Sequence, residues 1–222
     1  MANEDHIVKE NELEGLIFDC DGTLIDTMSA YFVSWTRICN EFGLTLSEQK
    51  FYSLAGVPVK DIIELLIKEA GKQDLLSVEE VFEKKCIYGI EAVNECGTPR
   101  IDCVVEYAKK YKKEGIPMAV ASSGNKEHVH KSLKDNGIFD WFDAVITCED
   151  VTNPKPAPDI YLLAAKKINC DPKKCRGFED GDVGMQSLRA AGLEAIDVRL
   201  WQGHPVYTLN NKGIDCNFCH IL

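Results

Sequence analysis

The sequence predicts an α/β fold: a doubly wound parallel sheet with a second, small helical domain inserted after the first strand. Three observations lead to this prediction. Short, nearly continuous apolar runs recur along the chain, stretches of helical periodicity separate them, and one long stretch between the first two runs has helical patterning only. Strands of a parallel sheet are this apolar because helices cover both of its faces.

The predicted strands and helices alternate along the chain. The strands are the apolar runs at residues 13–20, 117–122, 144–147, 175–180 and 193–198. The helices between them lie at residues 102–114, 126–136, 158–168 and 183–191. Glycine follows three of these helices, as is common at helix C-termini, at Gly115, Gly137 and Gly192. The alternation of strands and helices is typical of a parallel sheet with helices on both sides.

The connection between the first and second predicted strands is much longer than one crossover helix requires. Residues 28–95 show helical spacing of apolar side chains, for example at Tyr31, Trp35 and Ile38. We therefore predict a discontinuous core domain made of residues 1–26 and 98–222, with a helical domain at residues 27–97 inserted into it.

The overall charge and hydropathy exclude several classes of protein. The 222 residues carry a net charge of −11, which disfavours binding to nucleic acid or to an anionic membrane. No apolar stretch approaches the roughly 20 residues of a membrane helix. Residues 1–11 are polar and lack the apolar core of a signal peptide. These features predict a cytoplasmic protein with no nucleic-acid or membrane partner.

The ten cysteines are scattered along the chain, and in a cytoplasmic protein they are expected to be reduced thiols. Cys216 and Cys219, followed by His220, match the pattern of c-type haem attachment. This pattern stands two residues from the last residue, with no fold after it to enclose a haem, so we interpret it as a coincidence. Cys170 and Cys175 have no second pair with the spacing of a metal site.

Acidic residues follow the first predicted strand, at the end where parallel α/β sheets bind their ligands. Asp19 and Asp21 are two residues apart, and Gly22 and Thr23 come next. In an extended backbone such side chains point the same way, so two carboxylates there need a cation or a shared proton. A simple polar turn is the alternative, because Asp-Gly favours turns.

Polar groups also follow the second and third strands. Ser122 and Ser123 precede a helix, and hydroxyls with free N–H groups at a helix N-terminus can bind an anion or simply cap the helix. Lys155 stands between two prolines that restrict its backbone, which suits a fixed charge against phosphate. A solvated loop lysine is the alternative for that position.

Glu179 and Asp180 follow the fourth strand. Carboxylates together with a substrate phosphate are ligands that Mg²⁺ prefers, although acidic residues also favour a helix N-terminus. Each of the four groups has an ordinary explanation when taken alone. All four, however, fall at strand ends of one predicted sheet, and together they are the parts of phosphoryl transfer through an aspartyl-phosphate.

The order Asp19-x-Asp21-Gly22-Thr23, Ser122, Lys155, Glu179-Asp180 resembles the haloacid dehalogenase superfamily over residues 14 to about 200. The helical insertion looks like the small α-helical cap of the subgroup that includes β-phosphoglucomutase and sugar-phosphate phosphatases. The run FEDGDVGMQSLRAAGL is most similar to fructose-1-phosphate phosphatase-like members. The resemblance implies a Rossmann-type core and a cap that closes over the substrate.

The resemblance also implies a role for each motif residue. Asp19 would be the nucleophile and Asp21 the general acid and base. Mg²⁺ would be held by Asp19, the backbone carbonyl of Asp21 and Asp180, with Glu179 beside the ion or bound to it. The phosphate-binding residues would be Thr23, Ser122, Ser123 and Lys155. Dehalogenases lack the second acid, so Asp21 favours phosphate chemistry.

We expect an enzyme, a Mg²⁺-dependent phosphatase of small sugar or polyol monophosphates, whose partner is therefore a small phosphorylated metabolite. The alternative is a β-phosphoglucomutase-type mutase. Such mutases carry a His and an Arg that hold a second phosphate, and here Tyr31 and Val59 stand at those positions. Lys60 would compensate in part, which leaves the mutase open.

Two classes of protein without catalytic activity are less consistent with the sequence. Phospho-receiver domains also combine acidic residues, a hydroxyl and a lysine on a doubly wound sheet, but they have roughly the size of one ordinary domain, without a cap-sized insertion. A catalytically silent binding protein of the same fold is expected to have lost a motif residue, and all of them are present here.

Overall fold

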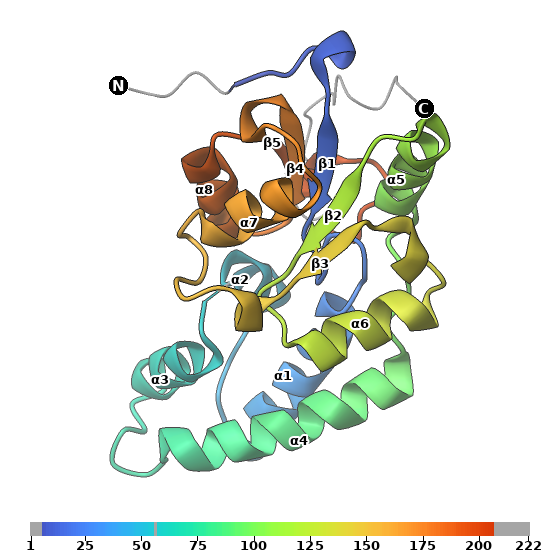
Figure 1. The fold of residues 1–222 in the computed structure, drawn as a ribbon. Coiled ribbons are helices and arrows are strands. Elements are labelled where there is room, and N and C mark those ends of the chain that lie inside the picture. The colour runs from blue at the N-terminus through green and yellow to red at the C-terminus, as the bar shows by residue number, and fades with distance from the viewer. Residues whose placement is uncertain (1–5, 56, 207–222) are drawn as a thin grey trace. The chain divides into compact units, whose positions relative to one another are not determined.

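The computed structural model describes residues 6–55 and 57–206. These residues divide into two compact units, one formed by residues 6–25 and 99–206, the other by the described residues of Asp26–Thr98 (Figure 1). The second unit covers the predicted insertion with one residue more at each end. Cys216 and Cys219 lie outside the described residues.

A five-stranded parallel sheet forms the centre of the first unit. Its strands are β1 (Gly15–Phe18), β2 (Met118–Ala121), β3 (Ala144–Ile146), β4 (Cys175–Glu179) and β5 (Glu194–Asp197). The order is β3-β2-β1-β4-β5, and all neighbouring strands are parallel. The strand order reverses at β1, which is where ligands bind in open sheets of this kind. The predicted fold class is confirmed.

Four α-helices cover the two faces of this sheet: α5 (Asp102–Glu114), α6 (Lys126–Asp135), α7 (Asp159–Lys167) and α8 (Asp182–Ala191). Successive residues of a strand face opposite sides, so Leu16 and Phe18 pack in one core cluster with residues of α5 and α6. Ile17, between them, packs in a second cluster with residues of α7 and α8. This two-sided burial explains why β1 and β2 are apolar throughout, whereas β4 and β5 also carry buried charged residues such as Arg176 and Glu194.

Short 3₁₀ helices precede, connect or follow these elements, at Glu10–Glu12, Phe139–Trp141, Cys148–Asp150, Pro172–Lys174 and Val198–Leu200. The bounds of α5 agree with the predicted helix at residues 102–114. Gly115 and Gly192 end their helices at φ +76° and +81°, a conformation that glycine adopts without strain.

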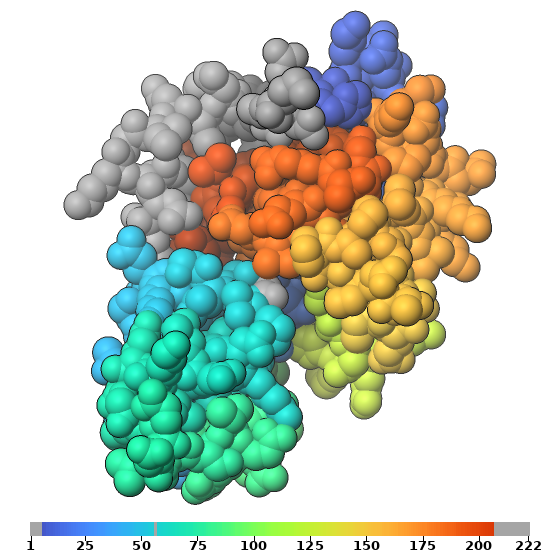
Figure 2. All heavy atoms as spheres, turned by 90° about the vertical axis from the view of Figure 1, so that its left-hand side faces the viewer, coloured from blue at the N-terminus to red at the C-terminus, as the bar shows by residue number. Residues whose placement is uncertain are grey.

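The described residues of the second unit form a bundle of four helices: α1 (Met28–Phe42), α2 (Glu48–Ser53), α3 (Val59–Glu69) and α4 (Val78–Cys96). Figure 2 shows one face of this unit, coloured from blue through light blue to green. Helices α1 and α3 both pack against α4. Their core is built around Trp35, Ile38, Ile63 and Val81. In the described ranges, no helix combines the length and the apolar character needed to cross a bilayer.

Candidate active site

The predicted polar groups converge at the carboxyl ends of the strands. The Nζ atom of Lys155, in the loop before α7, donates to Oδ1 of Asp19 and to Oε1 of Glu179, each at 2.6 Å. It also donates to the carbonyl oxygen of Ala121, the last residue of β2, at 3.0 Å. One ammonium group therefore joins the ends of β1, β2 and β4.

Strand register brings the carboxylates together. Phe18 pairs with Phe178, and the N–H of Asp19 donates to the carbonyl of Phe178 at 3.0 Å. Asp19 and Glu179 therefore leave their strands side by side. Beyond them, Gly22 turns the chain at φ +87°, where a Cβ atom would lie 2.1 Å from Oδ2 of Asp180. Both the backbone conformation and the space require glycine at this position.

Asp19, Glu179 and Asp180 form a buried acidic cluster. One carboxylate oxygen from each lies within 4.8 Å of the others. Burial, together with the charges of Glu179 and Asp180, raises the pKa of Asp19 well above its ordinary value against the opposing effect of Lys155. Burial and then the charge of Glu179 raise the pKa of Asp180 to about 8. Lys155 is the one ammonium group that the described residues place against these three carboxylates, which leaves a deficit of positive charge.

Lys155 is itself buried, with 6% of its side chain exposed. Burial alone would lower the pKa of Lys155, but the carboxylates of Asp19 and Glu179 more than offset that effect and raise it well above the ordinary value. The lysine is therefore a fixed cation within the site. This finding excludes the alternative of a solvated loop residue.

The acidic cluster fits a divalent cation. Its donors are hard carboxylate oxygens, which Mg²⁺ and similar ions prefer, and a cation would offset the repulsion that the burial of three carboxylates creates. The hydroxyl of Thr23 donates to Oδ1 of Asp180 at 3.3 Å and orients this carboxylate. Thr23 therefore contacts the acidic cluster itself.

Asp21 lies in a different environment from Asp19. Its side chain is 22% exposed, against 9% for Asp19. Its Oδ1 atom lies 3.0 Å from Nε2 of His128, and its Oδ2 atom accepts a longer bond of 3.4 Å from the hydroxyl of Ser122. The Oγ atom of Ser122 in turn accepts the N–H of Gly124 at 3.0 Å. The hydroxyl of Ser122, the N–H of Gly124 and the carboxylate of Asp21 thus meet after β2. Ser123, by contrast, is exposed.

Residues 16–198 match the family model of the haloacid dehalogenase-like hydrolases. The chain belongs to this family. The fructose-1-phosphate phosphatase YqaB of Escherichia coli is 34% identical to this hydrolase, over 84% of this chain and 96% of that protein. The β-phosphoglucomutase of Bacillus subtilis is 26% identical, over 87% and 86%. The predicted superfamily, and the prediction of an enzyme related to phosphatases, are confirmed.

A solved structure has the same fold as this hydrolase. The crystal structure of β-phosphoglucomutase from Clostridium difficile aligns with a TM-score of 0.66 and 23% identity, over 83% of this chain and 84% of that one.

Two residues of the site were not predicted from the sequence. The hydroxyl of Tyr161, in α7, donates to Oε1 of Glu179 at 2.6 Å, and burial followed by the charge of Glu179 keeps the pKa of this phenol well above its ordinary value. The only sign of this contact in the sequence was a tyrosine on the apolar face of a predicted helix, at residues 158–168.

His128 is the second residue, and the hydrogen bond to Asp21 raises its pKa against the effect of burial. Nothing in the pattern of α6 distinguishes this histidine from His130.

The residues predicted to select the substrate belong to the helical unit. Tyr31 lies in α1, and Val59 and Lys60 begin α3. The ammonium of Lys60 donates to Oε1 of Glu79 at 2.7 Å. A further lysine, Lys85, was not predicted: its ammonium lies 5.5 Å from the centre of the Tyr31 ring.

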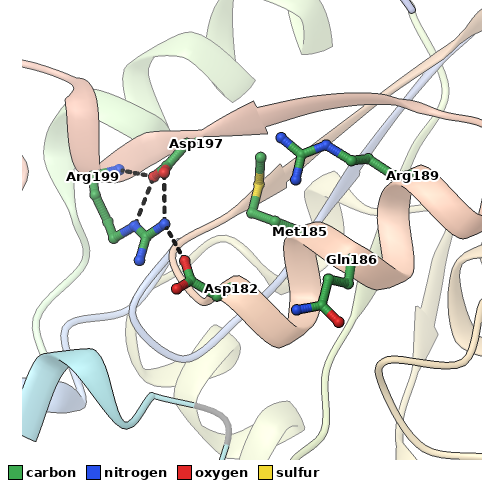
Figure 3. A pocket seen from close by; sticks show the side chains of 6 residues that line it. All are labelled: Asp182, Met185, Gln186, Arg189, Asp197 and Arg199. Carbon is green, nitrogen blue, oxygen red and sulfur yellow. Dashed lines mark hydrogen bonds and ion pairs between the residues drawn. The ribbon is translucent and has the colours of Figure 1, made fainter. Parts of the chain in front are cut away.

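A hollow of about 300 Å³ lies beside α8 and contains none of the predicted site residues (Figure 3). Its lining residues are Asp182, Met185, Gln186, Arg189, Asp197 and Arg199. The guanidinium of Arg199 donates to both oxygens of Asp197 and, at 2.7 Å, to Oδ1 of Asp182. These bonds tie the end of β5 to the start of α8. They thereby brace the turn that carries Asp180.

Proposed function

We propose that this hydrolase is a Mg²⁺-dependent phosphatase of small sugar or polyol monophosphates that acts through an aspartyl-phosphate on Asp19. The observation that carries the proposal is the buried contact between Lys155 and Asp19 inside the acidic cluster. A carboxylate held beside a fixed ammonium and a cation site is arranged to receive a phosphoryl group whose charge grows during transfer.

The chemistry requires two steps. A carboxylate oxygen of Asp19 attacks phosphorus, the bond from phosphorus to the ester oxygen breaks, and Asp21 gives a proton to the leaving oxygen. Water then attacks the phosphorus of the aspartyl-phosphate, Asp21 takes a proton from that water, and the bond from phosphorus to the Asp19 oxygen breaks, which releases inorganic phosphate and restores the carboxylate of Asp19. The greater exposure of Asp21 supports this assignment, because its carboxyl must exchange protons with both the leaving group and water.

The proposed metal ligands are Asp19, Asp180 and the backbone carbonyl of Asp21. Mg²⁺, when bound, would offset the negative charge of the carboxylates and of the phosphoryl group. The oxygens of Glu179 already accept bonds from Lys155, Tyr161 and the N–H groups of residues 180 and 181, which supports a place beside the ion rather than on it.

The phosphoryl oxygens are assigned to Lys155 and to the groups after β2. The hydroxyl of Ser122 and the N–H of Gly124 lie together beside Asp21, which supports a binding place for these oxygens. The exposed Ser123 would join them only once substrate is bound. The contact of Thr23 with Asp180 supports a role for Thr23 in orienting a metal ligand.

The substrate class rests on the relatives and on the helical unit, which we propose acts as a cap that selects the substrate, with its bounds near residues 27–97. YqaB is named for its action on fructose 1-phosphate. Lys60 is paired with Glu79, which disfavours its use for the second phosphate of a mutase substrate.

A cytoplasmic location, where thiols stay reduced, is part of the proposal.

A phosphosugar mutase is the second candidate, and Lys85 is the observation that favours it. Its ammonium lies 5.5 Å from the centre of the ring of Tyr31. Tyr31 is the residue that stands where mutases carry a His. Lys85 is buried against the rings of Tyr31 and Trp35, so it could hold a second phosphate only after its ammonium moved away from them. Val59, which is neutral, stands where mutases carry an Arg, and the ammonium of Lys60 is paired with Glu79. Both observations favour the phosphatase.

The test uses the purified full chain with Mg²⁺ and a panel of sugar and polyol monophosphates. We expect release of inorganic phosphate over many turnovers, and its loss in Asp19→Asn, whose amide is a poor nucleophile. A separate reaction with β-glucose 1-phosphate and its bisphosphate follows both glucose 6-phosphate and free phosphate. Efficient isomerisation with little phosphate release would establish the mutase, and a fully active Asp19→Asn variant would refute the aspartyl-phosphate.

A further inference from the structure

The two oxygens of Asp21 have unequal contacts. Oδ1 lies 3.0 Å from Nε2 of His128. Within residues 6–55 and 57–206, Oδ2 has one hydrogen bond, the long one of 3.4 Å from Ser122, and a Cβ atom placed on Gly124 would lie 3.3 Å from it. Oδ1 of Asp21 can accept a hydrogen bond from an N–H at Nε2 of His128 whether or not Oδ2 carries a proton. One oxygen is therefore held by the ring, and the other faces the hydroxyl and the glycine after β2.

The first turn of α6 fixes the position of His128. The side chain of Asn125 caps the helix by accepting the N–H of His128 at 2.9 Å. The next residue, Val129, is fully buried in the core under the same turn. His130 lies on another side of the helix, with its ring 5.0 Å from that of Phe139. The backbone of His128 is thus anchored independently of the bond that its ring makes to Asp21.

We propose that His128 is a positioning residue that holds Oδ1 of Asp21, so that Oδ2 carries the proton to the leaving oxygen and later takes one from water. The inference rests on the proposed function. Without the ring, the partly exposed carboxyl can rotate about its Cβ–Cγ bond, and Oδ2 loses its alignment with the phosphoryl group beside Ser122. Proton transfer then suffers, whereas phosphate binding by Lys155 and Ser122 does not.

The experiment compares His128→Leu, which removes the N–H donor, with His128→Gln, whose amide N–H can replace Nε2–H. The control is His130→Leu, the same change two residues further along α6. Turnover of the best sugar monophosphate is measured with Mg²⁺, as kcat and KM. A single-turnover measurement of p-nitrophenol release from p-nitrophenyl phosphate follows phosphoryl transfer to a leaving group that departs without a proton.

We expect His128→Leu to lower kcat on the sugar phosphate by about 10-fold to 100-fold, near the lower range of general acid catalysis, with KM changed less than about 3-fold. The first release of p-nitrophenol is expected to keep its rate within about 3-fold of the unaltered protein, because this step needs no acid. His128→Gln is expected to recover most of kcat, and His130→Leu to have the unaltered rate.

Three results would overturn the inference: a rise in KM alone, which would make His128 a substrate-binding residue; equal losses on both esters, which would indicate a general structural defect; and an active His128→Leu variant. Absence of phosphate release by the unaltered protein would refute the proposed function itself. If the unaltered protein releases phosphate and the His128 variants are equally active, only the role of His128 is refuted.

Discussion

The Nζ atom of Lys155 lies 2.6 Å from Oδ1 of Asp19, with both side chains at least nine-tenths buried. In this position the lysine neutralises part of the acidic cluster before substrate arrives. In the proposed mechanism, its place between the carboxylates and the end of β2 would also let it contact a phosphoryl group on Asp19. Removal of this ammonium should therefore affect catalysis and stability together.

Lys155→Met is expected to lower kcat by about 100-fold to 1000-fold, the usual cost of removing one preorganised group that offsets transition-state charge. It should also destabilise the metal-free protein by about 3–5 kcal/mol, because three buried carboxylates lose their cation. Steady-state kinetics with Mg²⁺ and urea unfolding without it measure the two effects. A variant with unchanged kcat would remove Lys155 from the chemistry.

Gly22→Ala is expected to reduce activity more than tenfold and to destabilise the chain by about 1–3 kcal/mol, the usual range for a residue in a strained backbone conformation. The new Cβ would lie 2.1 Å from Oδ2 of Asp180, so this buried carboxylate must move. Gly115→Ala is the matched control, because Gly115 also has positive φ but nothing within 4 Å of its Cβ position. Equal kinetic effects of the two changes would show that displacement of Asp180 is unimportant.

The strand ends were predictable from the sequence because each apolar run stops at a polar residue. Asp19 and Glu179 follow from this rule, and the parallel sheet places them at one edge. The contact of His128 with Asp21 was not predictable, because it depends on β2 lying next to β1 and on the direction of one ring in α6. Sequence order alone fixes neither.

The same reasoning explains the uncertainty about Lys155. The flanking prolines indicated a restricted loop, but whether its side chain points into the sheet edge or into water depends on tertiary packing. Lys85 shows a related limit. Its position in a helix rich in charged residues gave no sign that its ammonium is packed against the rings of Tyr31 and Trp35.

Mg²⁺ is expected to raise the melting temperature of the full chain, because an ion that binds only the folded state stabilises it by about 2.7 kcal/mol at 100 times its Kd. EDTA should abolish both this shift and phosphate release. Asp180→Asn should reduce the shift, since it removes one of the three clustered carboxylates, whereas Asp135→Asn, on the exposed side of α6, should not. Full activity in excess EDTA together with an unchanged melting temperature would contradict the metal site.

The last prediction concerns Lys85, the buried lysine of the helical unit. Its side chain packs against the rings of Tyr31 and Trp35, and the described part of the chain offers its ammonium no carboxylate. Burial lowers its pKa from 10.5 to about 8. A charge held in this way costs folding free energy, which the aromatic rings offset in part.

The sign of the pH dependence follows from this lowered pKa. Below pH 8 the lysine is charged in both folded and unfolded chains, and the cost is fully present. Between pH 8 and 10.5 the unfolded chain binds more protons than the folded one, so stability rises with pH as this cost disappears. Lys85→Met should therefore stabilise the chain at pH 7 by about 1–3 kcal/mol. This range stays below the total that a shift of this size allows, because each pKa unit corresponds to roughly 1.4 kcal/mol. The difference from the unaltered protein should shrink toward pH 10.

Lys84→Met is the matched control, because Lys84 is the neighbouring residue of α4 and its side chain is 46% exposed. This change should alter stability by less than about 0.5 kcal/mol at either pH. Urea unfolding of the full chains at pH 7 and pH 10, followed by circular dichroism, measures all three proteins. If Lys85→Met were less stable than the unaltered protein at pH 7, the ammonium would be contributing more through its ring contacts than it costs by burial, and the cationic group beside Tyr31 would be a stabilising part of the helical core.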